Sequence, residues 1–511
     1  MKPAIVIPTY WSSTQQLGTP GGVQCYDHAI PIDAPAPELE ACIASLQQVL
    51  GLAEAAVILL VVAPPTVEER AVHRVRDILD AHPWLPSETV IVDSFKAMVM
   101  RSILSQVLPD DIGEPISLRG YGAIRNLGLI TCCALGCDVA VFLDDDEVVL
   151  DENFLANAVY GMGQVDRQGM PVMAKSGYFL DRRNSALADR RNVKFYDKHW
   201  AKRAGFNEWM TQALAGPRIS RSPYLCGGCF ALYAEAYTRV AFDPWITRGE
   251  DEDYLINLRV YGMDVWFDNR WRVRHTPPRI KDTASRFLQD VYRWVYERRK
   301  IEMCNANIDL HKLTPNDLMP YPGPWISSEL PTRVRKTAFW RALMTPERAA
   351  YWRIYRGGLR DASQYAEENR MRYLDFQAHW HDVTTLAWLN VEIQSILAGD
   401  GMLNVEIASR MAARAGAVDR VETPARSSAP APVAPAAPAP AAASAPAHAA
   451  PAQHGTTYAS GSDAAVAANA VTAAAFAQQS APAPDAPAPD APADTAGDDM
   501  TPYMDFGGSG N

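Results

Sequence analysis

The sequence predicts an α/β protein built on an open, mostly parallel sheet that is flanked by helices. Short apolar runs without alternation are typical of strands that are buried on both faces of a sheet. Amphipathic stretches with helical spacing separate these runs, and this alternation is typical of parallel sheets. Carboxylates and glycines follow the runs directly, at the carboxyl ends of strands, where ligands of such sheets bind.

The predicted elements alternate through the first 275 residues. The strand-like runs are Ala4–Pro8, Val57–Val62, Thr89–Val92 and Val139–Leu143. The helix-like stretches between them are Glu38–Leu50, Val67–Leu79, Phe95–Val107 and Tyr121–Leu135. Further along, the pattern predicts a strand within Leu225–Tyr233, a helix from Glu250 to Val260 and a strand near Asp264–Phe267.

Composition divides the chain of 511 residues into three parts. We expect the sheet domain over residues 1–280 and a helical C-terminal extension over 281–421. Residues 422–511 hold 14 of the 38 prolines and few aromatic or branched apolar side chains. Such a segment cannot bury enough apolar surface to offset the entropy of ordering, so we expect a disordered tail rich in alanine and proline.

Charge and hydropathy argue against two classes of function. Of the net charge of −11, the tail from Glu422 onward carries −7, so the body is nearly neutral and has no concentrated basic charge for nucleic acid. No stretch approaches the roughly 20 apolar residues of a membrane span. A strand-like segment directly follows Met1-Lys2, without a leader pattern, and cysteines are sparse, so we expect a cytoplasmic protein.

The strongest candidate site is the acidic run Asp144-Asp145-Asp146-Glu147, which follows a predicted buried strand. Adjacent carboxylates repel one another unless a cation binds between them. Mg²⁺ and Mn²⁺ take carboxylate oxygens, with phosphates completing the coordination. The alternative is a turn that caps the next helix, for which one aspartate would be enough. The run therefore favours a metal site.

A second acidic run, Gly249-Glu250-Asp251-Glu252-Asp253, opens a predicted helix. Acids in a first helical turn interact favourably with the helix dipole, which is the structural alternative. Helical spacing places Glu250 and Asp253 on one face and turns Asp251 away by about 100°. A carboxylate placed near an acceptor hydroxyl can take its proton.

Three further signals are weaker when each is taken alone. His275 follows a strand-like stretch, where most histidines are structural. The glycines of Arg119–Asn126 lead into a helix, whose N-terminus suits an anionic group such as a diphosphate. Cys226 and Cys229 flank two glycines; zinc would need two more ligands, so small buried side chains explain the pair better.

In this order the motifs resemble family 2-type glycosyltransferases of the GT-A fold, over residues 4–276. The stretches that carry the resemblance are Val6–Tyr10, Gly122–Leu129, Phe142–Asp146, Gly227–Phe230 and Gly249–Asp253, with His275 after them. The resemblance implies transfer of a sugar from a nucleotide diphosphate, as a UDP- or GDP-sugar, to an acceptor hydroxyl. It also implies a Mn²⁺ or Mg²⁺ cofactor.

The resemblance implies a role for individual residues. Asp144, Asp146 and His275 would hold the metal. Asp251 would be the general base of an inverting enzyme, with Glu250 binding the acceptor; in a retaining enzyme Asp251 would only position the substrate. Donor contacts would come from Pro8, Thr9, Tyr10, Asp93, Arg125, Asp144, Asp145, Gly227 and Gly228. For Arg125 the alternative is a buried ion pair with a helix carboxylate.

Parts of the sequence depart from the family pattern. Val61–Pro65 stands where an aspartate-rich turn often holds the nucleobase, which leaves Asp93 as the candidate substitute. The insertion Trp11–Pro37 is a candidate flap over the donor. The segment Arg182–Pro223 is rich in basic residues and tryptophan, which suits a wall for a saccharide or for a phosphorylated or acidic acceptor; the alternative is an exposed charged loop.

Two other functions remain open at this point. A nucleotidyltransferase would usually carry a glycine-rich basic loop after its first strand, where this chain has Thr9–Ser12. A GT-A-like domain without catalysis would act as a scaffold through its tail. The presence of all the candidate acidic residues argues against that alternative.

Overall fold

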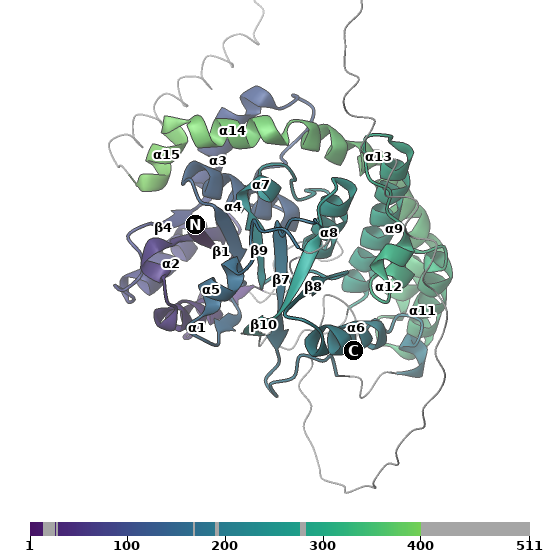
Figure 1. Cartoon of the computed structure of the whole chain (residues 1–511). Coiled ribbons are helices and arrows are strands. Elements are labelled where there is room, and N and C mark those ends of the chain that lie inside the picture. Colours follow the sequence, from purple (N-terminus) through teal and green to yellow (C-terminus); the bar gives the residue numbers. More distant parts are fainter. Residues whose placement is uncertain (14–25, 27–28, 167–168, 190–193, 276–282, 400–511) are drawn as a thin grey trace, which may run out of the picture. The chain divides into compact units, whose positions relative to one another are not determined.

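The computed structural model describes residues 1–13, 26, 29–166, 169–189, 194–275 and 283–399 (Figure 1). All of these residues belong to one compact unit. The predicted tail, residues 422–511, lies outside the described residues.

A mixed ten-stranded sheet forms the centre of this unit, and its order is β4-β3-β1-β5-β9-β7-β10-β6, with β2 beside β1 and β8 beside β10. The strands β4, β3, β1 and β5 run parallel, whereas β9 lies antiparallel between β5 and β7. The predicted fold class is therefore confirmed. The strand bounds are β1 Pro3–Ser12, β2 Ile30–Pro31, β3 Ala56–Val62, β4 Thr89–Val92, β5 Val139–Phe142, β6 Glu147–Val149, β7 Ala174–Leu180, β8 Ile219–Arg221, β9 Phe230–Tyr233 and β10 Val265–His275.

Helices connect and cover the strands (Figure 1). Those of the sheet region are α1 Glu38–Ser45, α2 Glu68–Asp80, α3 Ser94–Leu104, α4 Tyr121–Ala134, α5 Phe154–Val159, α6 Arg203–Ala215, α7 Ala234–Tyr237 and α8 Glu250–Val260. Those that follow are α9 Ala284–Ala306, α10 Gly323–Ile326, α11 Leu330–Met344, α12 Arg348–Arg353, α13 Leu359–Ala378, α14 Trp380–Leu389 and α15 Val391–Ala398.

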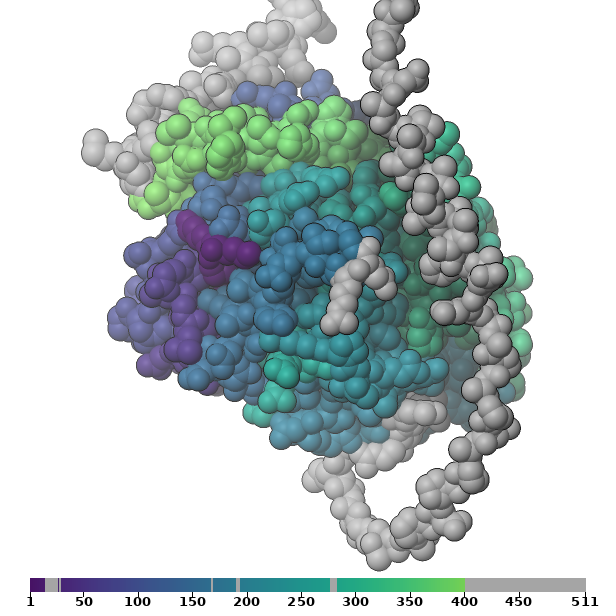
Figure 2. Space-filling view, viewed as in Figure 1, coloured from purple at the N-terminus to yellow at the C-terminus, as the bar shows by residue number. Residues whose placement is uncertain are grey.

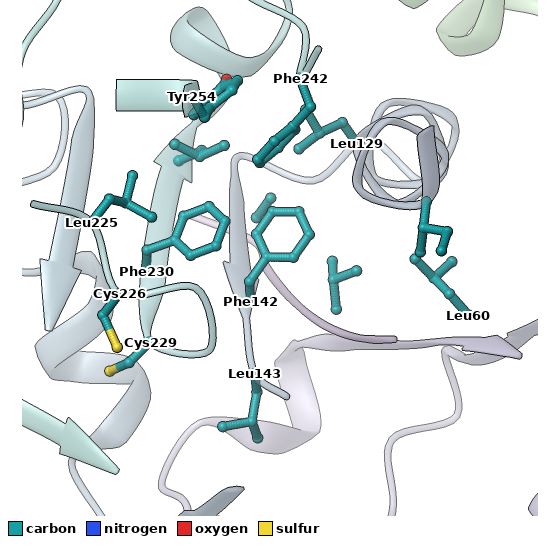
Figure 3. Packing of buried hydrophobic residues seen from close by; sticks show 14 of the residues in the cluster. Leu60, Leu129, Phe142, Leu143, Leu225, Cys226, Cys229, Phe230, Phe242 and Tyr254 are labelled. Carbon is teal, nitrogen blue, oxygen red and sulfur yellow. The ribbon is translucent and has the colours of Figure 1, made fainter. Parts of the chain in front are cut away.

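The core sits between the central strands and the helices that pack on them. All residues of β1 and β3 are buried, as the apolar runs predict. Figure 3 shows Phe142 of β5 beside Phe230 of β9, and their rings stack with centroids 4.5 Å apart. Phe242 and Tyr254 stack at 4.0 Å and extend this aromatic core to α8. The strand that precedes the first acidic run and the helix that carries the second are therefore held against one core.

Four strands that the sequence did not reveal, β2, β6, β7 and β8, complete the sheet, and two of them bear on the acidic run. The short strand β6 begins at Glu147, inside the acidic run, and pairs antiparallel with β10 so that His275 lies opposite Glu147. The strand β7 pairs parallel with β10. This register brings the last residue of β10 beside the acidic run, although 128 positions separate Glu147 from His275 in the sequence.

The helices after residue 283 pack on the sheet region rather than apart from it. Helix α9 contacts α8, α10, α11 and α13. Helices α14 and α15 return to the N-terminal part of the chain, where they contact α3, α4 and β4. Figures 1 and 2 show this returning band, coloured green, lying along the helices of the first half.

Candidate active site

The acidic run leaves the end of β5, next to the end of β1, and its side chains have separate partners. Asp145 Oδ2 accepts a hydrogen bond from the backbone N–H of Tyr10 at 3.2 Å. Asp146 Oδ2 lies 3.0 Å from Nε2 of His275. Asp144 is the partly exposed member of the run, and the carboxylates of Asp145 and Asp146 are buried.

The Asp146–His275 pair places a carboxylate and an imidazole side by side. Burial lowers the pKa of His275, but the charge and hydrogen bond of Asp146, together with the charges of Glu147 and Asp144, outweigh burial and raise the pKa to about 9. Burial and the negative charge of Asp144 also raise the pKa of Glu147 well above its usual value. Carboxyl groups are therefore concentrated at this end of the sheet, and His275 is the basic side chain beside Asp146.

Arg125 connects this acidic run to the second one. From the buried face of α4, its Nη2 donates to Asp144 Oδ1 at 2.9 Å and its Nε donates to Glu250 Oε1 at 3.2 Å. The guanidinium lies 5.0 Å from the ring centroid of Phe142. Its third nitrogen, Nη1, is buried and has no hydrogen-bond partner among the described residues. The buried pairing to a helix carboxylate, one of the two alternatives for Arg125, is thus present.

Two of the three residues that the resemblance assigns to the metal lie side by side in the structure. Among the described residues, no group of three or more His, Cys, Asp or Glu side chains is arranged to hold a metal ion. Asp144, which the resemblance also places in the metal set, forms an ion pair with Arg125 through Oδ1, and its role as a metal ligand stays a prediction. Asp146 and His275 are adjacent, and Mg²⁺ or Mn²⁺ commonly takes one or two protein ligands while substrate phosphates supply others. The two residues present fit such a site.

The second acidic run forms the first turn of α8, as predicted, and its members also diverge. Gly249 precedes the helix with φ of +66°, a left-handed conformation that favours glycine. Glu250 turns to Arg125, whereas Asp253 is fully buried and pairs with Lys300. Asp251 faces the glycine turn between β8 and β9. Burial, together with the charges of Glu250 and Glu252, raises the pKa of Asp251 to about 8.

The Gly227-Gly228 turn separates the two runs because neither residue has a side chain. A Cβ atom on Gly228 would overlap the Glu147 carboxyl group. A Cβ atom on Gly227 would lie 3.0 Å from Oδ2 of Asp251 and 3.6 Å from Nη2 of Arg125. The turn therefore leaves room for the first run on one side and for Asp251 on the other.

Helix α9 supports the second run with two buried cations that the sequence did not single out. Arg293 pairs with Glu252 and Glu297, and its guanidinium occupies the space that a side chain on Gly249 would fill. Lys300 Nζ lies 2.9 Å from Asp243 and also pairs with Asp253. The only sequence signal for this support was the helical spacing of the basic residues in α9. It did not reveal their role, because their acidic partners lie on elements that are distant in the sequence.

Of the residues predicted for the donor, Pro8, Thr9 and Tyr10 lie in the second half of β1, which continues to Ser12 rather than ending at Pro8 as predicted. Pro8 and Thr9 are buried in β1, and the Tyr10 ring packs against Tyr26 at 4.8 Å. Tyr26 comes from the insertion Trp11–Pro37, of which residues 14–25 and 27–28 lie outside the described part of the chain. Asp93 follows β4 and caps α3 by accepting the N–H of Lys96 at 2.9 Å. A role for Asp93 toward a nucleobase stays a prediction.

The segment predicted as an acceptor wall is only partly exposed. Trp200 and Trp209 are core residues, 1% and 7% exposed, and thus do not form an exposed surface for stacking on sugars as we expected. Lys202 is buried and lies 3.1 Å from Asp290. The exposed cations of the described part of this segment include Lys194 and Lys198, whereas Arg190 and Arg191 lie outside the described residues.

The two cysteines beside the glycine turn are buried, as the sequence analysis favoured (Figure 3). Burial raises the pKa of both thiols well above the usual value, with Glu147 adding to the effect. Cys226 and Cys229 therefore act as small core side chains.

No family model and no curated protein matches the chain. Among solved structures, the chain is similar to the mannosyltransferase PcManGT from Pyrobaculum calidifontis in complex with GDP-Man and Mn²⁺, with 14% identity over 76% of this chain and 87% of that one, at a TM-score of 0.38. The S. aureus TarS 1–349 structure is 11% identical over 76% of this chain and 91% of that one, at a TM-score of 0.36. The GalNAc-T7 structure with UDP, GalNAc and Mn²⁺ is 13% identical over 60% of this chain and 51% of that one, at a TM-score of 0.33.

These similarities are partial, so the assignment of the fold rests on the chain itself. The order of the strands and the acidic run after β5, beside the antiparallel strand β9, give the chain the GT-A fold that its motifs predict. Membership of family 2 in particular stays a prediction. Among the described residues, no helix is both long and apolar enough to cross a bilayer.

Proposed function

We propose that the chain is a metal-dependent glycosyltransferase that moves a sugar from a nucleotide diphosphate sugar to an acceptor hydroxyl with inversion. The observation that carries the proposal is the Arg125 fork. One buried guanidinium binds Asp144 of the first acidic run and Glu250 of the second. Arg125 therefore holds Asp144, on the proposed donor side, and Glu250, on the proposed acceptor side, in a fixed relation to one another. A sugar transferred between the two runs would contact both sides.

On the donor side, Asp146 and His275 would hold the cation. A bound Mn²⁺ or Mg²⁺ would neutralise the charge that develops on the departing diphosphate. The unpartnered Nη1 of Arg125 is buried, and a guanidinium N–H is a strong donor to an anionic oxygen. Arg125 would therefore bind an oxygen of the donor while its other nitrogens keep the two acidic runs in place.

On the acceptor side, the carboxylate of Asp251 would take the proton from the acceptor hydroxyl as that oxygen attacks the sugar. Its raised pKa makes it a better proton acceptor than an ordinary aspartate once it is ionised. Glu250, held by Arg125, would bind the acceptor beside it. The exposed Lys194 and Lys198 favour an acidic or phosphorylated acceptor.

The first test is calorimetric binding of UDP and of GDP to the full chain, each with and without Mn²⁺. We expect one nucleotide to bind only when the metal is present, which also identifies the class of donor. If neither nucleotide binds under either condition, the proposal is wrong, and a scaffold without catalysis becomes the better explanation.

Two substitutions separate the metal site from the base. Asp146→Ala should abolish the metal-dependent binding of nucleotide. Asp251→Asn should leave that binding unchanged and slow transfer by about 10²- to 10⁴-fold, the usual contribution of a general base. The exposed Asp361 provides a matched control, because Asp361→Asn should change neither quantity. Transfer by Asp251→Asn at the parent rate would remove the assignment of the base.

A further inference from the structure

A helical hairpin far from the acidic runs in sequence carries a row of rings that are exposed or half-buried. Helix α11 packs against α12 and the π-helical turn η6, Ile354–Gly358, while the turn η4, Phe195–Asp197, contacts α11. Ring centroids lie 5.9 Å apart for Phe195 and Trp340 and 5.5 Å for Trp340 and Phe339. Trp352 and Tyr355 both lie 5.8 Å from Phe339. These five residues form one continuous aromatic row, which we call the ring row.

Two rings of the ring row are exposed, the other three (Phe339, Trp340 and Trp352) are half-buried, and exposed aliphatic side chains follow on α11. Phe195 is 62% exposed and Tyr355 is 39% exposed. Leu343 and Met344, at the end of α11, are 40% and 48% exposed. Contiguous exposed apolar side chains are uncommon on a monomeric protein, and where they occur they often mark an interaction surface.

The same hairpin carries a net positive charge, whereas the chain as a whole is negative. Residues 330–360 contain eight arginines and lysines but a single acid, Glu347, in a chain of net charge −11. Arg333 and Arg341 pair with Glu329 and Asp197. The other five cations of α11, α12 and η6 are exposed, and none forms an ion pair with a described residue; they are Arg335, Lys336, Arg348, Arg353 and Arg356. Arg356 instead lies 5.8 Å from the ring centroid of Trp352.

We propose that this hairpin face docks on an anionic membrane surface. Tryptophan and tyrosine rings favour the level of the lipid headgroups, and aliphatic and phenylalanine side chains favour the acyl boundary beneath them. Unpaired lysines and arginines are attracted to anionic headgroups. A second copy of the same face would bring five unpaired cations against five others. A single-stranded nucleic acid would leave Leu343 and Met344 without an apolar partner.

The position of the face connects it with the catalytic region without depending on it. Phe195 belongs to Arg182–Pro223, the segment that we predicted as the acceptor wall, so docking would hold that segment next to the membrane surface. Binding to lipid does not require sugar transfer. Failure of the proposed function and failure of this inference therefore have different readouts.

The test is co-sedimentation of the full chain with vesicles. Vesicles of phosphatidylcholine alone are compared with vesicles of phosphatidylcholine mixed with phosphatidylglycerol, at low and at high salt. We expect binding to the anionic vesicles at low salt and its loss at high salt. Because each cation near such a surface contributes about 1 kcal/mol, the variant Lys336→Gln, Arg353→Gln, Arg356→Gln should bind on the order of a hundredfold more weakly.

Matched variants make the result specific to this face. Arg70→Gln, Arg239→Gln, Arg299→Gln removes three exposed cations elsewhere, each of them paired with an acid, and should bind as the parent does. Phe195→Ala, Trp340→Ala should weaken binding while the unfolding midpoint stays close to that of the parent. Equal loss in the control variant, or no binding of the parent to anionic vesicles, would overturn the proposal. So would binding of a single-stranded oligonucleotide, or a dimer that Trp340→Ala dissociates, if vesicles are not bound.

Discussion

At the scale of residues, the candidate site shows how two aspartates two positions apart acquire different chemistry. Asp144 meets the guanidinium of Arg125, which is permanently charged and neutralises it. Asp146 meets the imidazole of His275, and both side chains are of a kind that can bind a metal ion. The sequence DDDE is symmetrical in charge, but the partners supplied by α4 and β10 distinguish its members.

The pKa of Asp251 predicts the pH dependence of transfer. Burial and the neighbouring Glu250 and Glu252 raise this pKa to about 8, against the opposing charge of Arg293. A base must be ionised to accept a proton, and a carboxyl group with a raised pKa is protonated below that value. We therefore expect kcat/KM to fall about tenfold per pH unit below about 8. If kcat/KM stays constant down to a pH well below 8, the assignment of Asp251 as the base is contradicted.

Gly228 predicts a packing cost at the same site. In Gly228→Ala the new methyl group would overlap the Glu147 carboxyl group, so one of the two must move. Overpacking of this kind costs about 1–3 kcal/mol in the free energy of unfolding. Gly216→Ala is the control, since its Cβ would meet only backbone oxygens at 3.3 and 3.5 Å. Urea unfolding of the two variants measures the difference, and an equal cost would show that Glu147 can shift freely.

At the scale of elements, helix α9 is the support of the acidic helix α8. Four consecutive acids in the first turn of α8 would repel one another, and helix geometry by itself cannot separate them. Arg293 and Lys300 supply two buried cations on the face of α9 that meets α8. A helix of the C-terminal extension therefore determines the geometry of a motif that belongs to the sheet region.

Lys300 provides the test of this support. Lys300→Met would leave Asp243 and Asp253 buried without their cation, which costs about 3–5 kcal/mol in the free energy of unfolding. Arg298→Met, on the exposed face of the same helix, removes an ion pair with Glu302 and should cost less than about 1 kcal/mol. Urea unfolding compares the two. Similar small costs would mean that water reaches Asp243 and Asp253 in the folded chain.

At the scale of the whole described unit, its last two helices, α14 and α15, stabilise its N-terminal part. Trp380 of α14 is fully buried, and its Nε1 donates to the carbonyl of Tyr237 at 2.8 Å. Ile393 and Ile396 of α15 are also fully buried, and α15 contacts α3 and β4. The helices α14 and α15 are therefore part of the core that holds the sheet.

This arrangement predicts where the chain can be shortened. Residues 1–399 should keep the unfolding temperature and the nucleotide binding of the full chain. Residues 1–378 should unfold at a lower temperature and fail to bind nucleotide, because that cut removes core side chains. Within α14, Trp380→Ala should cost about 3–5 kcal/mol. Trp388→Ala, at a position 57% exposed, should stay within about 0.5 kcal/mol of the parent. Thermal unfolding measures all four, and a stable, binding-competent 1–378 would contradict the prediction.

Much of the fold could be predicted from the sequence, because local patterns carry it. The runs Val57–Val62 and Thr89–Val92 became β3 and β4 almost residue for residue. All of β3 is buried, whereas β4, at the end of the strand order, is buried only at alternate positions and not on both faces as predicted. The acidic helix began at Glu250 as its composition predicts. Shorter elements such as β6 escaped notice because a strand of three residues leaves no periodicity to detect.

The sequence by itself determined the residue types of the candidate site and their places at the ends of strands. Only the tertiary structure decided which of them meet. Asp146 lies beside His275 because β6 and β10 pair in one register, and Asp144 lies beside Arg125 because α4 packs against β5. Trp200 and Trp209 are core residues because tertiary packing covers them, which their local sequence does not show. Burial and ion pairing depend on contacts between distant segments, which local sequence patterns do not encode.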